Sequence, residues 1–328
     1  MMTRRKWMAA LAGGGGLTAL LAALGVRPRF RNGFSFAGSR KKVVNRPEDD
    51  STFLASPGIR CLVIGDWGTG HSLQSQIAGG MQAFARQTHP QFVISTGDNF
   101  YPRGVTSVDD PMFRTIFEDV YTGADLQIPW YAALGNHDHF GSIQSQISYS
   151  EHSSRWRLPS AWYRFSQAHD GVSADFFILD TDALVAGETR EQLGWLNHEL
   201  ESSTADWKIC VGHHPIRSYG HYGGDPTLVR EVKPILDRHG VAAYLCGHDH
   251  DLQLVKAPED HFVCVVSGGG GKARDTRFGE DSRFAWTNGG FAALTLTKTA
   301  LTAGFLDPDG NLAFVEHCLR IERTVASR

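Results

Sequence analysis

Five apolar segments of this 328-residue chain are each followed by a glycine and then by a side chain that can bind metal. The five sites read GDWG at residues 65–68, GDNFY at 97–101, GNHD at 135–138, GHHP at 212–215 and GHDH at 247–250. Open α/β sheets place ligand sites beyond the carboxyl ends of their strands, and glycine allows the sharp turn that exposes the next residue. The pattern predicts a fold that brings five strand ends together at one site.

Short apolar runs alternate with segments of helical periodicity from residue 58 onward. We expect strands at 60–64, 91–96, 130–134, 175–180, 207–211, 241–246, 261–266, 290–297 and 301–306, and helices at 71–87, 110–120, 188–202 and 226–239. The early alternation and the bunched late strands indicate an α/β sandwich with a mixed sheet. No internal repeat or second boundary interrupts residues 58–328, so we expect a single domain there.

The first 37 residues have the pattern of an export signal. The pair Arg4-Arg5 precedes an apolar stretch at 8–26, which a run of glycines makes only mildly hydrophobic, as in twin-arginine signals. A membrane anchor is the alternative, because residues 8–26 could just span a bilayer, but the glycines disfavour a helix. Small residues at 23–25 and 35–37 leave the cleavage site open, and 38–57 has the composition of a linker. We expect a periplasmic or secreted protein, with membrane association only through an uncleaved signal.

Charge and cysteine content exclude two classes of protein. The net charge of −3 provides no basic field for non-specific binding of nucleic acid. The five cysteines show no close pairing pattern, which argues against a disulfide scaffold. Four of them lie in apolar, strand-like runs, as buried free thiols do. We therefore expect no nucleic-acid partner and a fold that needs no disulfides.

Each candidate ligand has an ordinary structural explanation when it is considered alone. Asp66 and Asp98 could cap turns, Asn136 could be a turn residue, and His213 could be a core histidine. The two histidines of GHDH are more suggestive, because alternate residues of an extended segment point the same way. Five such sites in order, each after an apolar run, are hard to explain by chance and indicate a metal site.

Tyr101, in GDNFY, bears on which metals are bound. Histidines with an amide oxygen and a shared carboxylate suit a divalent ion such as Zn, Fe(II) or Mn. A phenol normally has a pKa near ~10 and ionises near neutrality only beside a strong positive charge. Tyr101 as a ligand would therefore indicate ferric iron in one of two sites. The alternative is a packed tyrosine whose hydroxyl only donates a hydrogen bond.

The five sites resemble the five sequence blocks of the calcineurin-like metallophosphoesterases. The tyrosine of GDNFY, together with GDNFYPRGV, PWYAALGNHDHFGSIQSQISYS, RWRLPSAWYRF and AYLCGHDHDLQ, is similar to the small tartrate-resistant branch of the purple acid phosphatases. The resemblance covers roughly residues 58–318 and implies a four-layer α/β/β/α sandwich with two mixed sheets. Animal members have a long cleavage-regulated loop before the helix predicted at 188–202, and this chain lacks it.

The resemblance also implies a role for each site residue. The ferric ligands would be Asp66, Tyr101 and His250, the bridging ligand Asp98, and the ligands of the divalent ion Asn136, His213 and His248. His137 and His221 would face the phosphate, with Asn136, and would stabilise or protonate the leaving alkoxide. His214 stands where the family usually has tyrosine, so its role is left open between support of a ligand and packing.

The function that the resemblance implies is an exported acid phosphatase. It would hydrolyse phosphate monoesters by attack of a metal-bound hydroxide at an Fe(III)–M(II) centre, where the divalent ion is Fe(II), Zn or Mn. A phosphodiesterase of the same superfamily and a non-catalytic phosphate- or metal-binding exported protein are the alternatives. The tyrosine disfavours the first, and the full set of seven candidate ligands disfavours the second. We expect a monomer.

Overall fold

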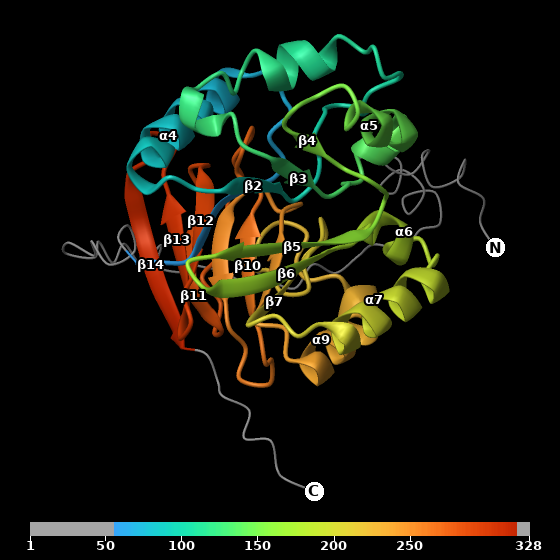
Figure 1. Cartoon of the computed structure of the whole chain (residues 1–328), viewed down its shortest axis with the longest axis vertical. Coiled ribbons are helices and arrows are strands. Elements are labelled where there is room, and N and C mark those ends of the chain that lie inside the picture. The colour runs from blue at the N-terminus through green and yellow to red at the C-terminus, as the bar shows by residue number, and fades with distance from the viewer. Residues whose placement is uncertain (1–55, 320–328) are drawn as a thin grey trace, which may run out of the picture. The chain divides into compact units, whose positions relative to one another are not determined.

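The computed structural model describes residues 56–319, which lie in one compact unit (Figure 1). The export signal predicted at 1–37 and nearly all of the linker predicted at 38–57 lie outside the described residues. No helix in the described part of the chain is long and apolar enough to cross a membrane.

The first of two mixed sheets has the strand order β14-β13-β12-β1-β2-β3-β4. Its strands are β1 (Ile59–Ile64), β2 (Phe92–Ser95), β3 (Trp130–Ala132), β4 (Trp156–Arg157), β12 (Phe291–Leu296), β13 (Ala300–Leu306) and β14 (Leu312–Leu319). Strands β1 to β4 are parallel to one another, whereas β12, β13 and β14 join antiparallel beside β1. The carboxyl ends of β1, β2 and β3 therefore lie at the same edge of the sheet.

The second sheet has the order β11-β9-β10-β8-β7-β6-β5. Its strands are β5 (Tyr163–His169), β6 (Val172–Ile178), β7 (Trp207–Val211), β8 (Ala243–Cys246), β9 (Leu252–Val255), β10 (Val263–Ser267) and β11 (Ser282–Trp286). Here β6, β7, β8 and β10 are parallel, whereas β5 pairs antiparallel with β6, β9 with β10, and β11 with β9. The candidate ligands that follow β7 and β8 therefore also share one edge.

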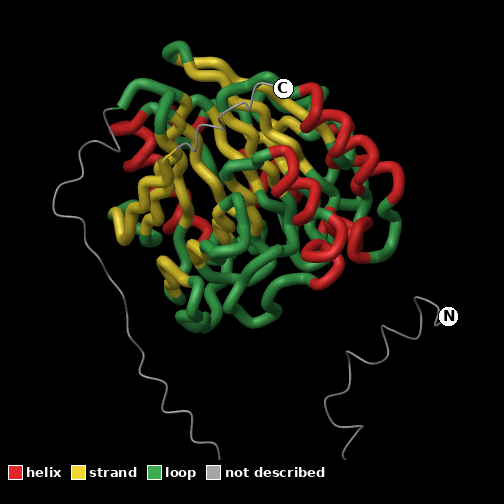
Figure 2. Tube along the Cα trace, turned by 90° about the horizontal axis from the view of Figure 1, so that it is seen from below, coloured by secondary structure: helices red, strands yellow, loops and turns green. Residues whose placement is uncertain are grey.

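Helices cover the outer face of each sheet, so the layers are α/β/β/α, as expected (Figure 1). One side carries α4 (Ser72–Thr88), a π-helical turn (Phe113–Glu118), a 3₁₀ turn (Ala124–Leu126) and α5 (Ile143–Tyr149). The other side carries α6 (Thr181–Val185), α7 (Arg190–Ser202), α8 (Pro226–Glu231) and α9 (Lys233–His239). A second 3₁₀ turn, Asp138–Phe140, follows the GNHD site. Figure 2 shows the strands in the middle of this unit with helices at the sides.

Alternation along the strands divides the core into two clusters. In β6, Phe176 and Ile178 belong to the larger cluster, which also contains residues of the first sheet and of α4, whereas Phe177 belongs to the cluster formed with α7, α8 and α9. Likewise Cys210 and Tyr244 face the outer cluster, where they meet leucines of α7, α8 and α9. Because successive strand residues point to opposite faces, strands that are apolar throughout can pack on both sides. The larger cluster thereby joins residues of both sheets.

The structure corrects some expected elements. The helix predicted at 110–120 is only the π-helical turn, and the helix predicted at 226–239 is two helices that meet at Val232. The break agrees with Pro234, which has no N–H to continue the first helix. Strands β4, β5, β9, β11 and β14 and helices α5 and α6 were not expected. The turn Asp170-Gly171, with both residues at positive φ, joins β5 to β6, and this Asp-Gly pair is a hairpin signal that the sequence carries.

The cysteine prediction agrees with the structure. Cys61, Cys210, Cys246 and Cys264 are buried free thiols, and Cys318 is half-buried and also free. Burial raises the pKa of each buried thiol, so they stay protonated. They serve as small apolar residues of the sheets.

Candidate metal centre

The candidate ligands lie in five loops, each directly after a strand. The first three loops follow β1, β2 and β3 of one sheet, and the other two follow β7 and β8 of the other sheet. Asp66, Asp98 and His248 have φ values of +55°, +53° and +68°. A side chain rarely occupies this left-handed region, and such strain concentrates at functional sites.

One group of donor atoms forms around the phenol of Tyr101. Its Oη lies 3.0 Å from Oδ1 of Asp66 and 2.8 Å from Oδ2 of Asp98. The same Oη lies 3.3 Å from Nε2 of His250, and that nitrogen is 3.3 Å from Oδ1 of Asp66. Three oxygens and one imidazole nitrogen therefore converge on one point.

A second group forms around the imidazole of His213. Its Nε2 lies 3.2 Å from Oδ1 of Asn136, 3.2 Å from Nδ1 of His248 and 3.5 Å from Oδ1 of Asp98. The other ring nitrogen of His213 is 2.9 Å from the carbonyl oxygen of Thr96, which fixes the ring. The two oxygens of Asp98 thus face different donor groups, so this carboxylate lies between them.

The charges of these groups favour a bound cation. Burial raises the pKa of Asp66, and the neighbouring carboxylate of Asp98 raises it further. Burial also raises the pKa of Asp98 and lowers the pKa of His213, His248 and His250, the last to about 4. Among the described residues, no lysine or arginine pairs with either carboxylate. Buried carboxylates facing neutral imidazoles are costly unless a metal ion compensates them.

The donor atoms form a possible metal site around Asp98, which belongs to both donor groups. Atoms of Asp66, Asp98 and His213 all lie within 4.8 Å of one another, close enough for a metal site. The first donor group offers carboxylate, phenol and imidazole, and the second offers carboxylate, amide oxygen and two imidazoles. The first set suits a hard cation and the second a borderline divalent one.

A buried carboxylate, Asp138, connects two of the ligand loops. It accepts hydrogen bonds from the backbone N–H groups of Gly135 and Asn99, and from the side-chain amides of Asn99 and Gln146. The loops that carry Asp98 and Asn136 are therefore held in register. The sequence analysis did not identify Asp138 or Asn99, although both lie within the GDNFY and GNHD sites themselves.

His137 lies beside the first donor group. Its ring centroid is 4.4 Å from that of Tyr101, and its Nε2 is 4.0 Å from Oδ2 of Asp98. Its Nδ1 lies 2.7 Å from the carbonyl oxygen of Pro102, and about 30% of the side chain is exposed. The ring is thus held at the mouth of the site with one face open to solvent.

The loop from Ser218 to Gly223 places Tyr222, rather than His221, against a candidate ligand. The Tyr222 ring stacks on His248 with a centroid distance of 4.3 Å. His221 is exposed, and its ring contacts Tyr222 at 4.8 Å. Both rings are exposed, and in a glycine-flanked loop the sequence cannot indicate which of two neighbouring rings stacks on a candidate ligand.

His214, whose role was left open, contacts both Thr181 and the candidate ligand His248. Its Nδ1 lies 3.0 Å from Oγ1 of Thr181, and its ring is 4.4 Å from that of His248. Asp249 holds the loop itself, because it accepts hydrogen bonds from the N–H groups of Tyr222 and Gly223. Both residues therefore position His248 and its surroundings.

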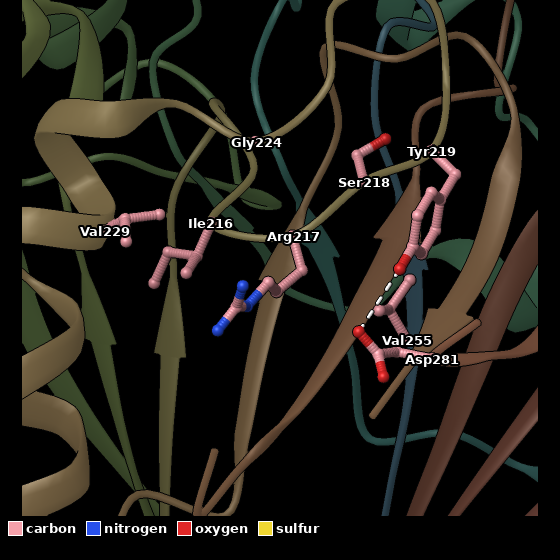
Figure 3. Close-up of a pocket in the computed structure, with 8 residues that line it drawn as sticks. All are labelled: Ile216, Arg217, Ser218, Tyr219, Gly224, Val229, Val255 and Asp281. Atoms are coloured by element: carbon pink, nitrogen blue, oxygen red, sulfur yellow. Dashed lines mark hydrogen bonds between the residues drawn. The ribbon is translucent and has the colours of Figure 1, made fainter. Parts of the chain in front are cut away.

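Two cavities lie near this loop. One, of about 460 Å³, is lined by His221, Ala273, Arg274, Asp275 and Thr287. The other, of about 250 Å³, lies among Ile216, Arg217, Ser218, Tyr219, Gly224, Val229, Val255 and Asp281 (Figure 3). In Figure 3 the Tyr219 hydroxyl donates a hydrogen bond to Asp281, with an Oη–Oδ2 distance of 3.2 Å. None of the candidate metal ligands lines the second cavity, so it is separate from the metal centre.

Comparison with known proteins identifies the family of this chain. The family model described as calcineurin-like phosphoesterase matches residues 59–252. Tartrate-resistant acid phosphatase type 5 of Oryctolagus cuniculus is 35% identical over 296 residues, which cover 79% of this chain and 90% of that protein. The chain belongs to the purple acid phosphatases, within the calcineurin-like phosphoesterase family. Purple acid phosphatase 4 of Arabidopsis thaliana is 36% identical over 281 residues, covering 77% of this chain and 81% of that protein.

Solved structures show that this purple acid phosphatase has the fold of its family. Purple acid phosphatase PPD1 from yellow lupin (Lupinus luteus) seeds aligns with a TM-score of 0.64 at 16% identity, covering 81% of this chain and 54% of that chain. GAP50, the anchor in the inner membrane complex of Plasmodium, aligns with a TM-score of 0.75 at 23% identity, covering 82% and 91%. The predictions of the family, of a phosphoesterase-family enzyme and of a sandwich with two mixed sheets are thereby confirmed.

Proposed function

We propose that this purple acid phosphatase is an exported enzyme that hydrolyses phosphate monoesters at a dinuclear centre of Fe(III) and a divalent ion. The observation that carries the proposal is the position of Asp98, whose two carboxylate oxygens face two different donor groups. The names of the relatives, which are acid phosphatases, support the reaction. The divalent ion is Fe(II), Zn or Mn, the metals that such a nitrogen and oxygen set accepts.

Each ion would take its ligands from one donor group. Asp66, Tyr101 and His250 would hold Fe(III), Asn136, His213 and His248 would hold the divalent ion, and Asp98 would bind both. When bound, the two ions supply positive charge for a phosphate dianion and the Lewis acidity that makes water a nucleophile at acidic pH.

The other polar residues at the mouth act on the ester. His137 stands beside Tyr101 with part of its ring exposed, which suits transfer of a proton to the leaving alkoxide. Asn136 would contact the phosphate from the divalent side. His221, on the wall of the larger cavity, would meet the leaving group rather than the reacting phosphorus.

Export by the twin-arginine route would carry the folded protein across the membrane, so the metals could be bound before secretion. That route is proposed from Arg4-Arg5 and the mildly apolar stretch at 8–26. We expect the protein to be a periplasmic or secreted monomer. Its substrates would be phosphate monoesters, and we expect no nucleic-acid partner.

The experiment that tests the metal centre is a visible spectrum with metal analysis of the purified protein. We expect iron together with one divalent metal, hydrolysis of phenyl phosphate, and a charge-transfer band from the Tyr101 phenolate. Burial and the nearby Asp66 carboxylate raise the pKa of the metal-free Tyr101 phenol, so a phenolate band reports a bound cation.

Replacement of the phenol separates a ligand from a packed tyrosine. Tyr101→Phe keeps the ring and should remove the band, while iron content and part of the activity fall. Tyr121→Phe is the control, because Tyr121 is a buried tyrosine that packs among the rings of Trp67 and Trp130, whereas Tyr101 is partly buried among the candidate ligands. A coloured Tyr101→Phe protein with full iron content would contradict the proposed Fe(III) site.

A further inference from the structure

The larger cavity adjoins the metal centre but contains none of its candidate ligands. It is about 460 Å³ in volume, and its lining combines His221, next to Tyr222, with residues of the segment after β10. His221, in the wall of this cavity, is followed in the chain by Tyr222, and the Tyr222 ring stacks on the candidate ligand His248. A group attached to a phosphate at the metal centre can therefore extend into it.

The segment after β10 is packed closely against the ligand loops. A Cβ atom on Gly268 would lie 2.1 Å from the carbonyl oxygen of Asp249, and one on Gly271 would lie 2.5 Å from that of Trp67. Glycine at both positions permits this approach. The N–H of Arg274 then donates to the carbonyl oxygen of His250 at 2.7 Å. The backbone of Arg274 is thus anchored on a candidate ligand residue.

The side chain of Arg274 carries a charge that is not paired with an acidic group in the described part of the chain. Its Cζ lies 5.2 Å from the centroid of the Tyr222 ring, so the guanidinium lies over the ring that also stacks on His248. Within residues 56–319 its side chain has no hydrogen-bond or ion-pair partner, and its Nη1 is buried without an acceptor. A guanidinium has five N–H donors that match carboxylate and phosphate oxygens, so an anion is the group it lacks.

We propose that Arg274 forms a subsite for a second anionic group of the substrate. The preferred substrates are then phosphate monoesters whose alcohol part carries a carboxylate or a further phosphate. This inference rests on the proposed phosphatase function of the metal centre and adds the substrate class to it.

Asp275, on the same wall, carries the opposite charge but does not cancel this preference. Its side chain is exposed, whereas that of Arg274 is partly buried. Water screens an exposed charge more strongly than a partly buried one. His221 and Thr287 add polar groups that can bind the same anion without a net negative charge.

The test compares two substrates that differ by one carboxylate, phenyl phosphate and 4-carboxyphenyl phosphate. Arg274→Met removes the charge and keeps the length of the side chain. It should lower kcat/KM for the carboxylated ester by about tenfold, mainly through KM, as expected for loss of a charge-assisted hydrogen bond in a partly exposed site. The value for phenyl phosphate should stay within about twofold.

Arg277→Met is the matched control, because Arg277 is an exposed arginine of the same segment that does not line the cavity. Arg277→Met should leave kcat/KM unchanged for both substrates, and both variants should unfold at the wild-type temperature. An unchanged preference in Arg274→Met, or equal losses for the two esters, would overturn the subsite.

Failure of the wild-type enzyme to hydrolyse phenyl phosphate would contradict the phosphatase function instead. The subsite is then measured by calorimetric binding of the two esters to the metal-loaded protein. Tighter binding of the carboxylated ester, lost in Arg274→Met, would support the subsite, and equal binding would overturn it.

Discussion

Replacing Asp138 with alanine should destabilise the protein more than any change at an exposed acidic residue. Its buried carboxylate accepts hydrogen bonds from the backbone N–H groups of Gly135, Asn99 and Phe100 and from the side chain of Gln146. Alanine leaves these three backbone donors without an acceptor, at about 1–3 kcal/mol for each buried unpaired group. Partial relaxation and entry of water offset part of this cost. We expect the free energy of unfolding to fall by about 3–5 kcal/mol, a large share of a typical total.

Urea unfolding of the metal-free protein, followed by circular dichroism, measures this change without a contribution from metal binding. Asp110→Ala is the control, because Asp110 also accepts hydrogen bonds, from Thr106 and Met112, but in a partly exposed turn. Water can replace those bonds, so the loss there should stay below about 1 kcal/mol. An Asp138→Ala protein with the wild-type free energy of unfolding would refute the proposed link between the two loops.

Three further outcomes are expected. His137→Ala should lower turnover of alkyl phosphates by about 10²-fold or more, with the metals retained. Turnover of nitrophenyl phosphate should fall by less, because a good leaving group needs no acid. Equal losses in steady-state assays would indicate a positioning role instead. Burial is the largest influence on the pKa of His139 and lowers it, but the hydrogen bond to Asp180 and the charges of Asp180, Asp182 and Asp138 together raise it, so the net shift is upward. The resulting stabilisation is present at acidic pH and is lost as pH rises, so His139→Gln should cost about 1 kcal/mol in urea unfolding at pH 5 and little at pH 8. A similar cost at both pH values would show that the ion pair is not the cause. Changing Arg4 and Arg5 to lysine should leave precursor in the cytoplasm on cell fractionation, and unchanged export would exclude the twin-arginine route.

Much of the sandwich could be predicted because its parallel strands are apolar on both faces and its helices are periodic. The carboxyl ends of β1, β7 and β8 fall at the predicted residues, whereas β2 ends one residue earlier than predicted and β3 ends two residues earlier, at Ala132. The missed strands are short or lie at edges. β5 mixes polar with apolar residues, and β4 has only two residues, so their pairing depends on neighbouring strands rather than on their own composition.

The sequence alone determined which residue types follow the strand ends, because Gly before Asp, Asn or His is a local pattern that needs no partner. It could not determine how the donors group, since the loops after β1, β2 and β3 meet those after β7 and β8 only when two separate sheets pack. The tertiary structure decided that the oxygens of Asp98 face two groups, and that Tyr222 rather than its neighbour His221 stacks on His248. It also decided that Arg274 lies over that ring. The physical reason is that these contacts join segments far apart in the chain, and their geometry follows from packing rather than from local preference.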